Sequence, residues 1–142
     1  MTRKSLFKKG APPENEHLWG LYSCRNVAGL RDPGLDVQMV KVLHDSEIET
    51  FGNLSYKFPP PGGVTAIVIV GASRADAHCW PEFGTCILGC FACGDKDAQM
   101  YKFLYGMMRH LRPKKTFEIP ERIIYPYLPD PIPFTWRSIE AH

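Results

Sequence analysis

Residues 64–93, VTAIVIVGASRADAHCWPEFGTCILGCFAC, decide the fold of this chain. They open on Val64–Val70, the most β-branched run in the sequence, which predicts a central strand. Residues 76–82 and 85–93 are expected to form a hairpin around Phe83-Gly84. Strands joined by such short connections run antiparallel, so this segment predicts a largely antiparallel sheet.

Two helices are expected outside this segment. Asp32-Pro33 offers one helix start, and Pro113 stops a second helical pattern that begins at residue 95. Apolar residues recur at helical spacing in both patterns. They are Leu35, Met39, Val42 and Leu43 in the first, and Ala98, Tyr101, Leu104, Tyr105, Met108 and Leu111 in the second.

Three further strands complete the element order. Residues 17–24 are short and aromatic, residues 48–58 alternate loosely before a proline-rich turn, and residues 116–124 follow the second helix. The resulting order is β-α-β-β-β-β-α-β. It predicts an α+β, two-layer sandwich, with two helices on one face of the sheet.

Length and composition indicate one domain without a nucleic-acid or membrane partner. The 142 residues are 44% hydrophobic with a formal charge of +2, which is too weakly basic for a nucleic-acid surface. The longest apolar run falls far short of a membrane span, and the basic N-terminus has no secretory apolar stretch, so a cytoplasmic location is expected. We divide the chain into a flexible basic leader (1–16), one α+β domain (17–124) and a proline-rich tail (125–142).

The five cysteines are an odd set, and in a reducing compartment they are expected to be thiols. The pair Cys90-x-x-Cys93 invites a zinc hypothesis, but strand alternation would point these two side chains to opposite faces. No metal site is therefore expected. Cys79, Cys86 and Cys90 are interpreted as small apolar core residues.

Ser73, His78 and Cys93 are the candidate reactive residues. With a two-residue loop, the hairpin would pair Arg74 with Cys93 and place Ser73 beside Gly94. His78 follows Ser73 by five positions, which in an unbroken strand would send their side chains to opposite faces. A bulge between residues 74 and 77 would be needed to bring them together.

This window resembles the prokaryotic S-adenosylmethionine decarboxylase proenzyme family, which is pyruvoyl-dependent. The resemblance covers about residues 17 to 120 and implies the S-adenosylmethionine decarboxylase-like fold. The matching positions, at the spacings of the family signature, are Ser73, His78, Trp80-Pro81-Glu82, Gly84 and Cys93-Gly94.

The resemblance implies that the chain cuts itself between Ala72 and Ser73. The Ser73 hydroxyl would attack the preceding carbonyl, and elimination of the resulting ester would leave a pyruvoyl group derived from Ser73. Thr65, where the family has serine, and His78 would assist, since imidazole moves protons near neutral pH. The pyruvoyl carbonyl would form a Schiff base with a substrate amine and act as an electron sink.

The resemblance also implies roles in the decarboxylation itself. Cys93 would protonate the substrate carbon, Glu82 would accept hydrogen bonds from the ribose hydroxyls, and Phe58 would stack on the adenine or the sulfonium. The product would be the aminopropyl donor for spermidine and other polyamines. A homodimer of processed protomers, whose sheets or loops complete each other's sites, is expected.

Three departures from the family pattern leave alternatives open. Ala72 replaces a glutamate, Arg74 replaces a histidine, and Gly89 stands where an aspartate is usual. The charge of Arg74 could select another carboxylate substrate, so a pyruvoyl-dependent arginine or ornithine decarboxylase is one alternative. An unprocessed relative that binds a ligand or partner without catalysis is another.

Overall fold

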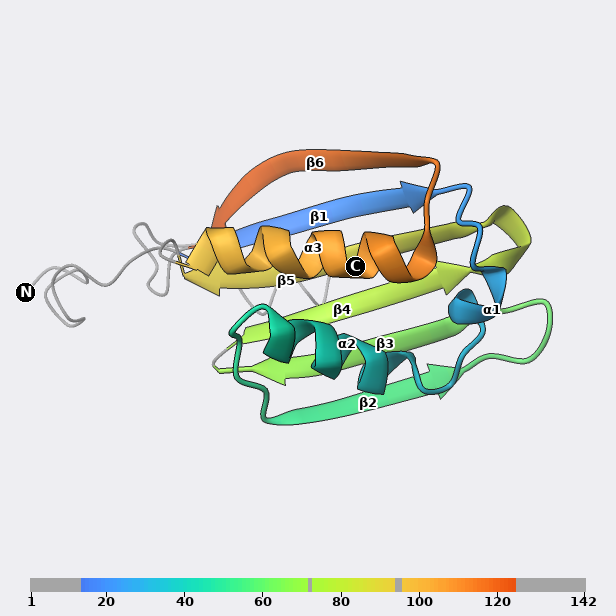
Figure 1. The fold of residues 1–142 in the computed structure, drawn as a ribbon, viewed down its shortest axis with the longest axis horizontal. Coiled ribbons are helices and arrows are strands. Elements are labelled where there is room, and N and C mark those ends of the chain that lie inside the picture. The colour runs from blue at the N-terminus through green and yellow to red at the C-terminus, as the bar shows by residue number, and fades with distance from the viewer. Residues whose placement is uncertain (1–13, 72, 94–95, 125–142) are drawn as a thin grey trace, which may run out of the picture.

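The fold is a single six-stranded sheet, seen in a computed structural model that describes residues 14–71, 73–93 and 96–124 (Figure 1). The strands lie in the order β2-β3-β4-β5-β1-β6, and every neighbouring pair is antiparallel. The sheet therefore confirms the predicted antiparallel class. The strands are β1 (Glu14–Tyr22), β2 (Gly52–Lys57), β3 (Val64–Val70), β4 (Ser73–Trp80), β5 (Thr85–Cys93) and β6 (Lys115–Ile124).

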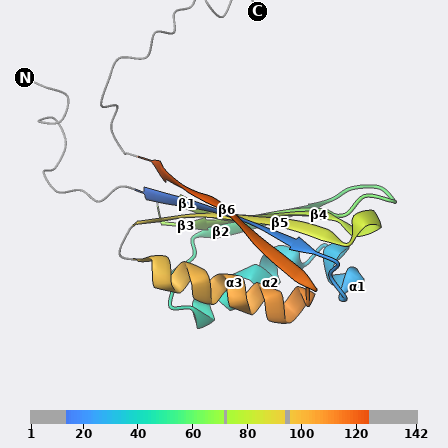
Figure 2. The same cartoon turned by 90° about the horizontal axis from the view of Figure 1, so that it is seen from above.

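The helices of the described chain all lie on one face of this sheet, as Figure 2 shows. They are α1 (Val27–Leu30), α2 (Leu35–Asp45) and α3 (Asp97–Leu111), with a short 3-10 helix, η2 (Pro81–Phe83), in the β4–β5 turn. The two long helices were predicted, whereas the single turn of α1 was not. None of the described helices is long and apolar enough to cross a membrane.

The hydrophobic core lies between the sheet and the helices. In β3, Val64, Ala66, Val68 and Val70 are buried, while the residues between them face the other way. The buried residues of α2 include all four predicted positions. The buried residues of α3 are Met100, Phe103, Leu104, Gly106, Met107 and Leu111, of which Leu104 and Leu111 are among the expected apolar positions.

The predicted β4–β5 register is wrong by two residues. Trp80 pairs directly with Thr85, so the loop holds four residues rather than two. Pro81 starts the 3-10 turn, and Gly84 closes it at φ +64°, a conformation that glycine adopts without strain. Ala75 consequently faces Cys90, and Arg74 is not the partner of Cys93.

The bulge that would be needed to bring Ser73 and His78 together is absent from β4. The β3–β4 pairing runs in one register from Val70 opposite Ser73 to Thr65 opposite His78. Ser73 and His78 therefore stay on opposite sides of a regular strand.

The first described strand begins before the expected start of the α+β domain. β1 begins at Glu14, within the range expected for the leader, and β6 ends at Ile124 as the sequence predicts. The rest of the leader and the whole tail lie outside the described residues.

Candidate active site

Side chains of the middle strands form a polar row on the face of the sheet that carries no helix. Thr65 of β3 and His78 of β4 are cross-strand partners, and the Thr65 hydroxyl lies 3.4 Å from His78 Nδ1. Oδ1 of Asp76 lies 3.5 Å from Nε2 of the same imidazole. The ring thus stands between a hydroxyl and a carboxylate, an arrangement suited to moving a proton.

Arg74 continues this row toward the start of β4. Its Nε lies 2.8 Å from Oδ2 of Asp76, and its guanidinium carbon lies 4.0 Å from the centre of the Phe91 ring. Arg74 is therefore engaged by a carboxylate and an aromatic face rather than projecting as a free cation.

Ser73 is the first residue of β4, at the end of the strand away from His78, where the chain leaves the turn after β3. Gly71, in that turn, has φ +61°. The Ser73 hydroxyl oxygen is buried and has no hydrogen-bond partner among the described residues. Cys93 ends β5 at the same end of the sheet, with its backbone opposite Glu14. Ala72 and the Cys93 side chain lie outside what the structure describes.

Glu82 and Phe58 lie at the other end, together with Thr65 and His78. Glu82 is exposed in η2. Phe58 follows β2, is 46% exposed and packs edge-to-face on Tyr56 with ring centres 4.9 Å apart. The Phe58 amide donates to the Gly63 carbonyl, which holds this loop beside the start of β3.

The expected site residues therefore fall into two groups on one chain. At ~3.3 Å per residue, the five positions from Ser73 to His78 span about 16 Å of strand. We call the two groups the cleavage end (Ser73, Arg74 and Cys93) and the histidine end (Thr65, His78, Glu82 and Phe58). In Figure 1, β4 begins and β5 ends at the left of the view, and the connection between β4 and β5 lies at the right.

The cysteines of the described core are buried free thiols. Burial raises the pKa of Cys24 to about 11, and burial together with the Asp76 carboxylate raises the pKa of Cys90. Such thiols are poor nucleophiles and poor metal ligands at neutral pH. Within the described ranges, no group of three potential ligands is placed to hold a metal ion.

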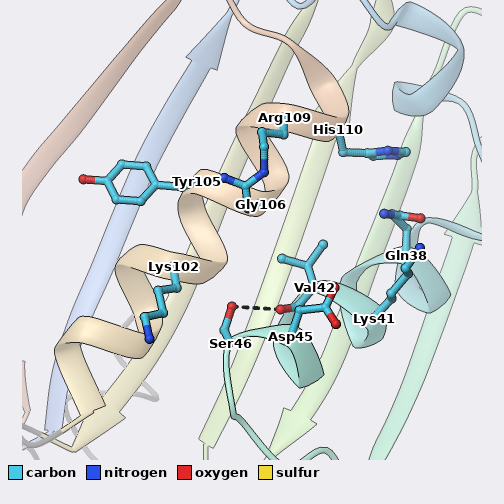
Figure 3. Close-up of a pocket in the computed structure, with 10 residues that line it drawn as sticks. All are labelled: Gln38, Lys41, Val42, Asp45, Ser46, Lys102, Tyr105, Gly106, Arg109 and His110. Carbon is cyan, nitrogen blue, oxygen red and sulfur yellow. Dashed lines mark hydrogen bonds between the residues drawn. The ribbon is translucent and has the colours of Figure 1, made fainter.

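A groove of about 440 Å³ lies between α2 and α3, on the far side of the sheet from the polar row (Figure 3). Lys41, Lys102 and Arg109 line it beside Asp45. His110 also lines it, and burial lowers the pKa of this imidazole. None of the expected site residues reaches this groove.

Comparison with known proteins identifies the family. The model of the family described as S-adenosylmethionine decarboxylase matches residues 17–119. The chain belongs to the S-adenosylmethionine decarboxylase family. It is thereby placed among the carboxy-lyases, which confirms the resemblance read from residues 73–94.

Individual relatives of the S-adenosylmethionine decarboxylase family agree. A protein of Pyrobaculum aerophilum named S-adenosylmethionine decarboxylase proenzyme is 33% identical over 103 residues, which cover 70% of this chain and 79% of the relative. Its namesake in Pyrobaculum neutrophilum is 31% identical, over 75% of this chain and 86% of that protein. The crystal structure of the adenosylmethionine decarboxylase from Aquifex aeolicus VF5 matches with a TM-score of 0.70 and 19% identity, over 82% of this chain and 93% of that one. That structure supports the fold.

Asp76 was missed among the candidate site residues. Strand alternation alone puts it on the same face as Arg74 and His78, two positions from each. Its burial and its place between a cation and an imidazole could be read only from the structure.

Proposed function

We propose that this chain is a self-processing, pyruvoyl-dependent decarboxylase of S-adenosylmethionine, cleaved between Ala72 and Ser73. Family membership is the main support, because relatives that match most of the chain carry the name proenzyme. The spacing of Ser73, His78, Glu82 and Cys93 supports it at the level of residues.

The free hydroxyl of Ser73 supports self-cleavage. A buried hydroxyl without a hydrogen-bond partner is costly, and such groups are concentrated where chemistry needs them. Its oxygen would bond to the carbonyl carbon of residue 72, and the Ser73 nitrogen would leave that carbon and take up a proton. Elimination, with loss of the Ser73 Cα proton, then releases the residue 72 carboxylate and leaves a dehydroalanine. Its imine tautomer takes up one water molecule and loses ammonia, which leaves a pyruvoyl group at the start of β4.

The pyruvoyl group supplies an electron sink for the bond that loses carbon dioxide. Around it, we assign Cys93 to protonation of the substrate carbon. Glu82, an exposed carboxylate, is free to accept hydrogen bonds from ribose hydroxyls. Phe58, exposed beside Tyr56, offers an aromatic face for the adenine or the sulfonium.

The two separated ends indicate that the working unit is a homodimer. A single chain holds His78 about 16 Å of strand from Ser73. A twofold axis between two facing sheets, perpendicular to the strands, would bring the cleavage end of one protomer opposite the histidine end of its partner. Each site would then combine the cleavage end of one chain, where Ser73 begins β4 and Cys93 ends β5, with the partner's Thr65, the partner's His78 and the partner's Glu82.

The uncovered face of the sheet has the composition that such a dimer needs. Large apolar side chains are exposed on strands across its whole width, although scattered single exposures are the norm in monomers. They are Tyr22, Leu54, Tyr56, Ile67, Ile69, Trp80, Phe117 and Ile119.

The alternatives differ in substrate or in activity. Glu82 favours a ribose-bearing substrate over arginine or ornithine, whereas the engagement of Arg74 with Asp76 removes the argument for a free carboxylate-binding cation. We further propose that the product, decarboxylated S-adenosylmethionine, serves spermidine synthesis. The proposed location is the cytoplasm.

The intact mass of the purified chain under denaturing conditions tests this function, with Ser73→Ala as the control. Two fragments that divide at Ala72-Ser73, the second blocked by pyruvoyl and both absent from Ser73→Ala, are expected. Release of carbon dioxide is then measured with S-adenosylmethionine, arginine and ornithine. A chain that stays whole in both variants would contradict self-processing, and release from arginine or ornithine alone would contradict the substrate.

A further inference from the structure

We propose that Asp76 is a positioning residue, held by Arg74, that fixes the ring orientation and the tautomer of His78. The proposal rests on the proposed function only for the reaction that His78 serves. The arrangement of Arg74, Asp76 and His78 is independent of it.

The two oxygens of Asp76 have different neighbours. Oδ2 lies 2.8 Å from Arg74 Nε, a charge-assisted hydrogen bond of ordinary length. Oδ1 lies 3.5 Å from His78 Nε2, at the long limit for a hydrogen bond between these atoms. Asp76 is 6% exposed, so its carboxylate cannot turn away into water.

Gly89 makes this position of Asp76 possible. It faces Asp76 across the β4–β5 ladder, and a Cβ added at residue 89 would lie 2.8 Å from Asp76 Oδ1. Atoms this close must move apart. The family pattern usually has an aspartate at position 89. In this chain that position of β5 is a glycine, and its cross-strand partner in β4, Asp76, carries the carboxylate.

The carboxylate decides which nitrogen of His78 carries the proton. An ionised carboxylate only accepts hydrogen bonds, so Nε2 facing Oδ1 must be the N–H donor. Nδ1 is then unprotonated, and it accepts from the Thr65 hydroxyl 3.4 Å away. Asp76 thus presents a basic nitrogen to Thr65 and turns a ring that could adopt either tautomer into one defined acceptor.

Arg74 makes the effect of an amide at position 76 predictable. In Asp76→Asn the guanidinium needs an acceptor, so the amide oxygen should take the place of Oδ2. The amide NH₂ then faces His78 Nε2 and donates to it. The proton of the imidazole is expected to move to Nδ1, which inverts the tautomer without removing any group from the network.

The experiment is a measurement of the imidazole ¹⁵N chemical shifts of His78 in the full-length Ser73→Ala chain, at about pH 8.5, where imidazoles are generally neutral. The expected spectrum has a protonated Nε2 and an unprotonated Nδ1. Adding Asp76→Asn should exchange the two assignments, whereas Asp45→Asn, the same change on the exposed end of α2, should not. Thermal melts confirm that each variant is folded. If the Asp76→Asn chain does not fold, Gly89→Ala replaces it. The added methyl group crowds Asp76 Oδ1, and it should weaken the preference of the His78 proton for Nε2.

The functional consequence is measured in chains that retain Ser73. Asp76→Asn should slow self-cleavage about tenfold or more, part of the 10²–10⁴-fold that a proton-transfer group contributes. A protonated Nδ1 in the parent chain, or an unchanged spectrum in Asp76→Asn, would overturn the proposal. An inverted tautomer with an unchanged cleavage rate would overturn its role in the reaction. A parent chain that never cleaves would instead overturn the proposed function and leave the spectra to decide the positioning.

Discussion

The two ends of the central strands carry different parts of one motif. At the cleavage end, Ser73 has a buried hydroxyl without a partner among the described residues. At the histidine end, His78 is flanked on both ring nitrogens, by Thr65 and by Asp76. The nucleophile is thus left free, whereas the proton-transfer group is held. Residues close in sequence are thus far apart in space when an extended strand connects them.

The largest effect on self-cleavage is expected when the cleavage end of one chain no longer meets the histidine end of its partner. The double variant Leu54→Glu/Phe117→Glu places charges on the uncovered face, on β2 and β6, where both side chains are exposed in the single chain. A dimer carries four substituted side chains. If only two of them each lose ~1.5 kcal/mol of apolar burial at the interface, the Kd of the dimer rises about a hundredfold or more. Sedimentation should show monomers, and self-cleavage should be lost with the dimer.

Val37→Glu/Tyr105→Glu is the matched control for this double variant. Both of its side chains are equally exposed but belong to α2 and α3, on the helical face. It should sediment and cleave as the parent does. A monomeric Leu54→Glu/Phe117→Glu chain that still cleaves at the parent rate would contradict the proposal that the two ends meet between chains.

Removing the proton-transfer group should have the next largest effect. His78→Gln keeps a polar side chain of similar size but cannot carry a proton, and self-cleavage should slow by about 10²–10⁴-fold. The measurement is the rate at which freshly made chain is converted to fragments. His44→Gln changes an exposed histidine that contacts Thr50 on the helical side, and it should cleave normally. Equal rates for the two variants would remove His78 from the reaction.

The smallest of these effects is expected at Glu82. In Glu82→Gln the hydrogen bonds from the ribose hydroxyls lose a charged acceptor, worth about 1.5–3 kcal/mol. KM for S-adenosylmethionine should therefore rise by about 10–100-fold, with a much smaller change in kcat and normal self-cleavage. Glu47→Gln, at an exposed carboxylate after α2, is the control. An unchanged KM would show that Glu82 does not contact the substrate.

The fold could be predicted from the sequence where one pattern dominated. Val64–Val70 forms β3 at the predicted residues because alternate β-branched side chains fill the core. The β4–β5 register could not be predicted, since it depends on whether Pro81 and Glu82 continue the strand or turn into η2. Of the apolar positions expected in the second helix, Leu104 and Leu111 are buried, whereas Ala98 and Tyr105 are exposed. Helical spacing alone does not say which of two overlapping apolar stripes meets the sheet.

The site was predictable as a set of residues but not as an arrangement. The spacing of Ser73, His78 and Cys93 indicated the family, and the bulge that would have joined Ser73 to His78 in one chain does not exist. Proximity between them requires a second chain, and one sequence carries no signal for that. Asp76 was overlooked because an aspartate in a strand has no meaning until its neighbours Arg74 and Gly89 are placed.

A site shared between two chains is tested by mixing two defective chains in one cell and measuring cleavage. One chain carries Ser73→Ala, and the other carries His78→Ala and a distinguishing tag. In a mixed dimer, one site combines the tagged chain's Ser73 with the partner's His78, both unsubstituted, and is therefore complete. The other site lacks both residues. With random pairing half of the dimers are mixed, and about a quarter of all sites should be complete, each one cleaving a tagged chain. Cleavage of the tagged chain only when both chains are present is the predicted result. A tagged chain that stays whole in demonstrated mixed dimers would contradict the shared site.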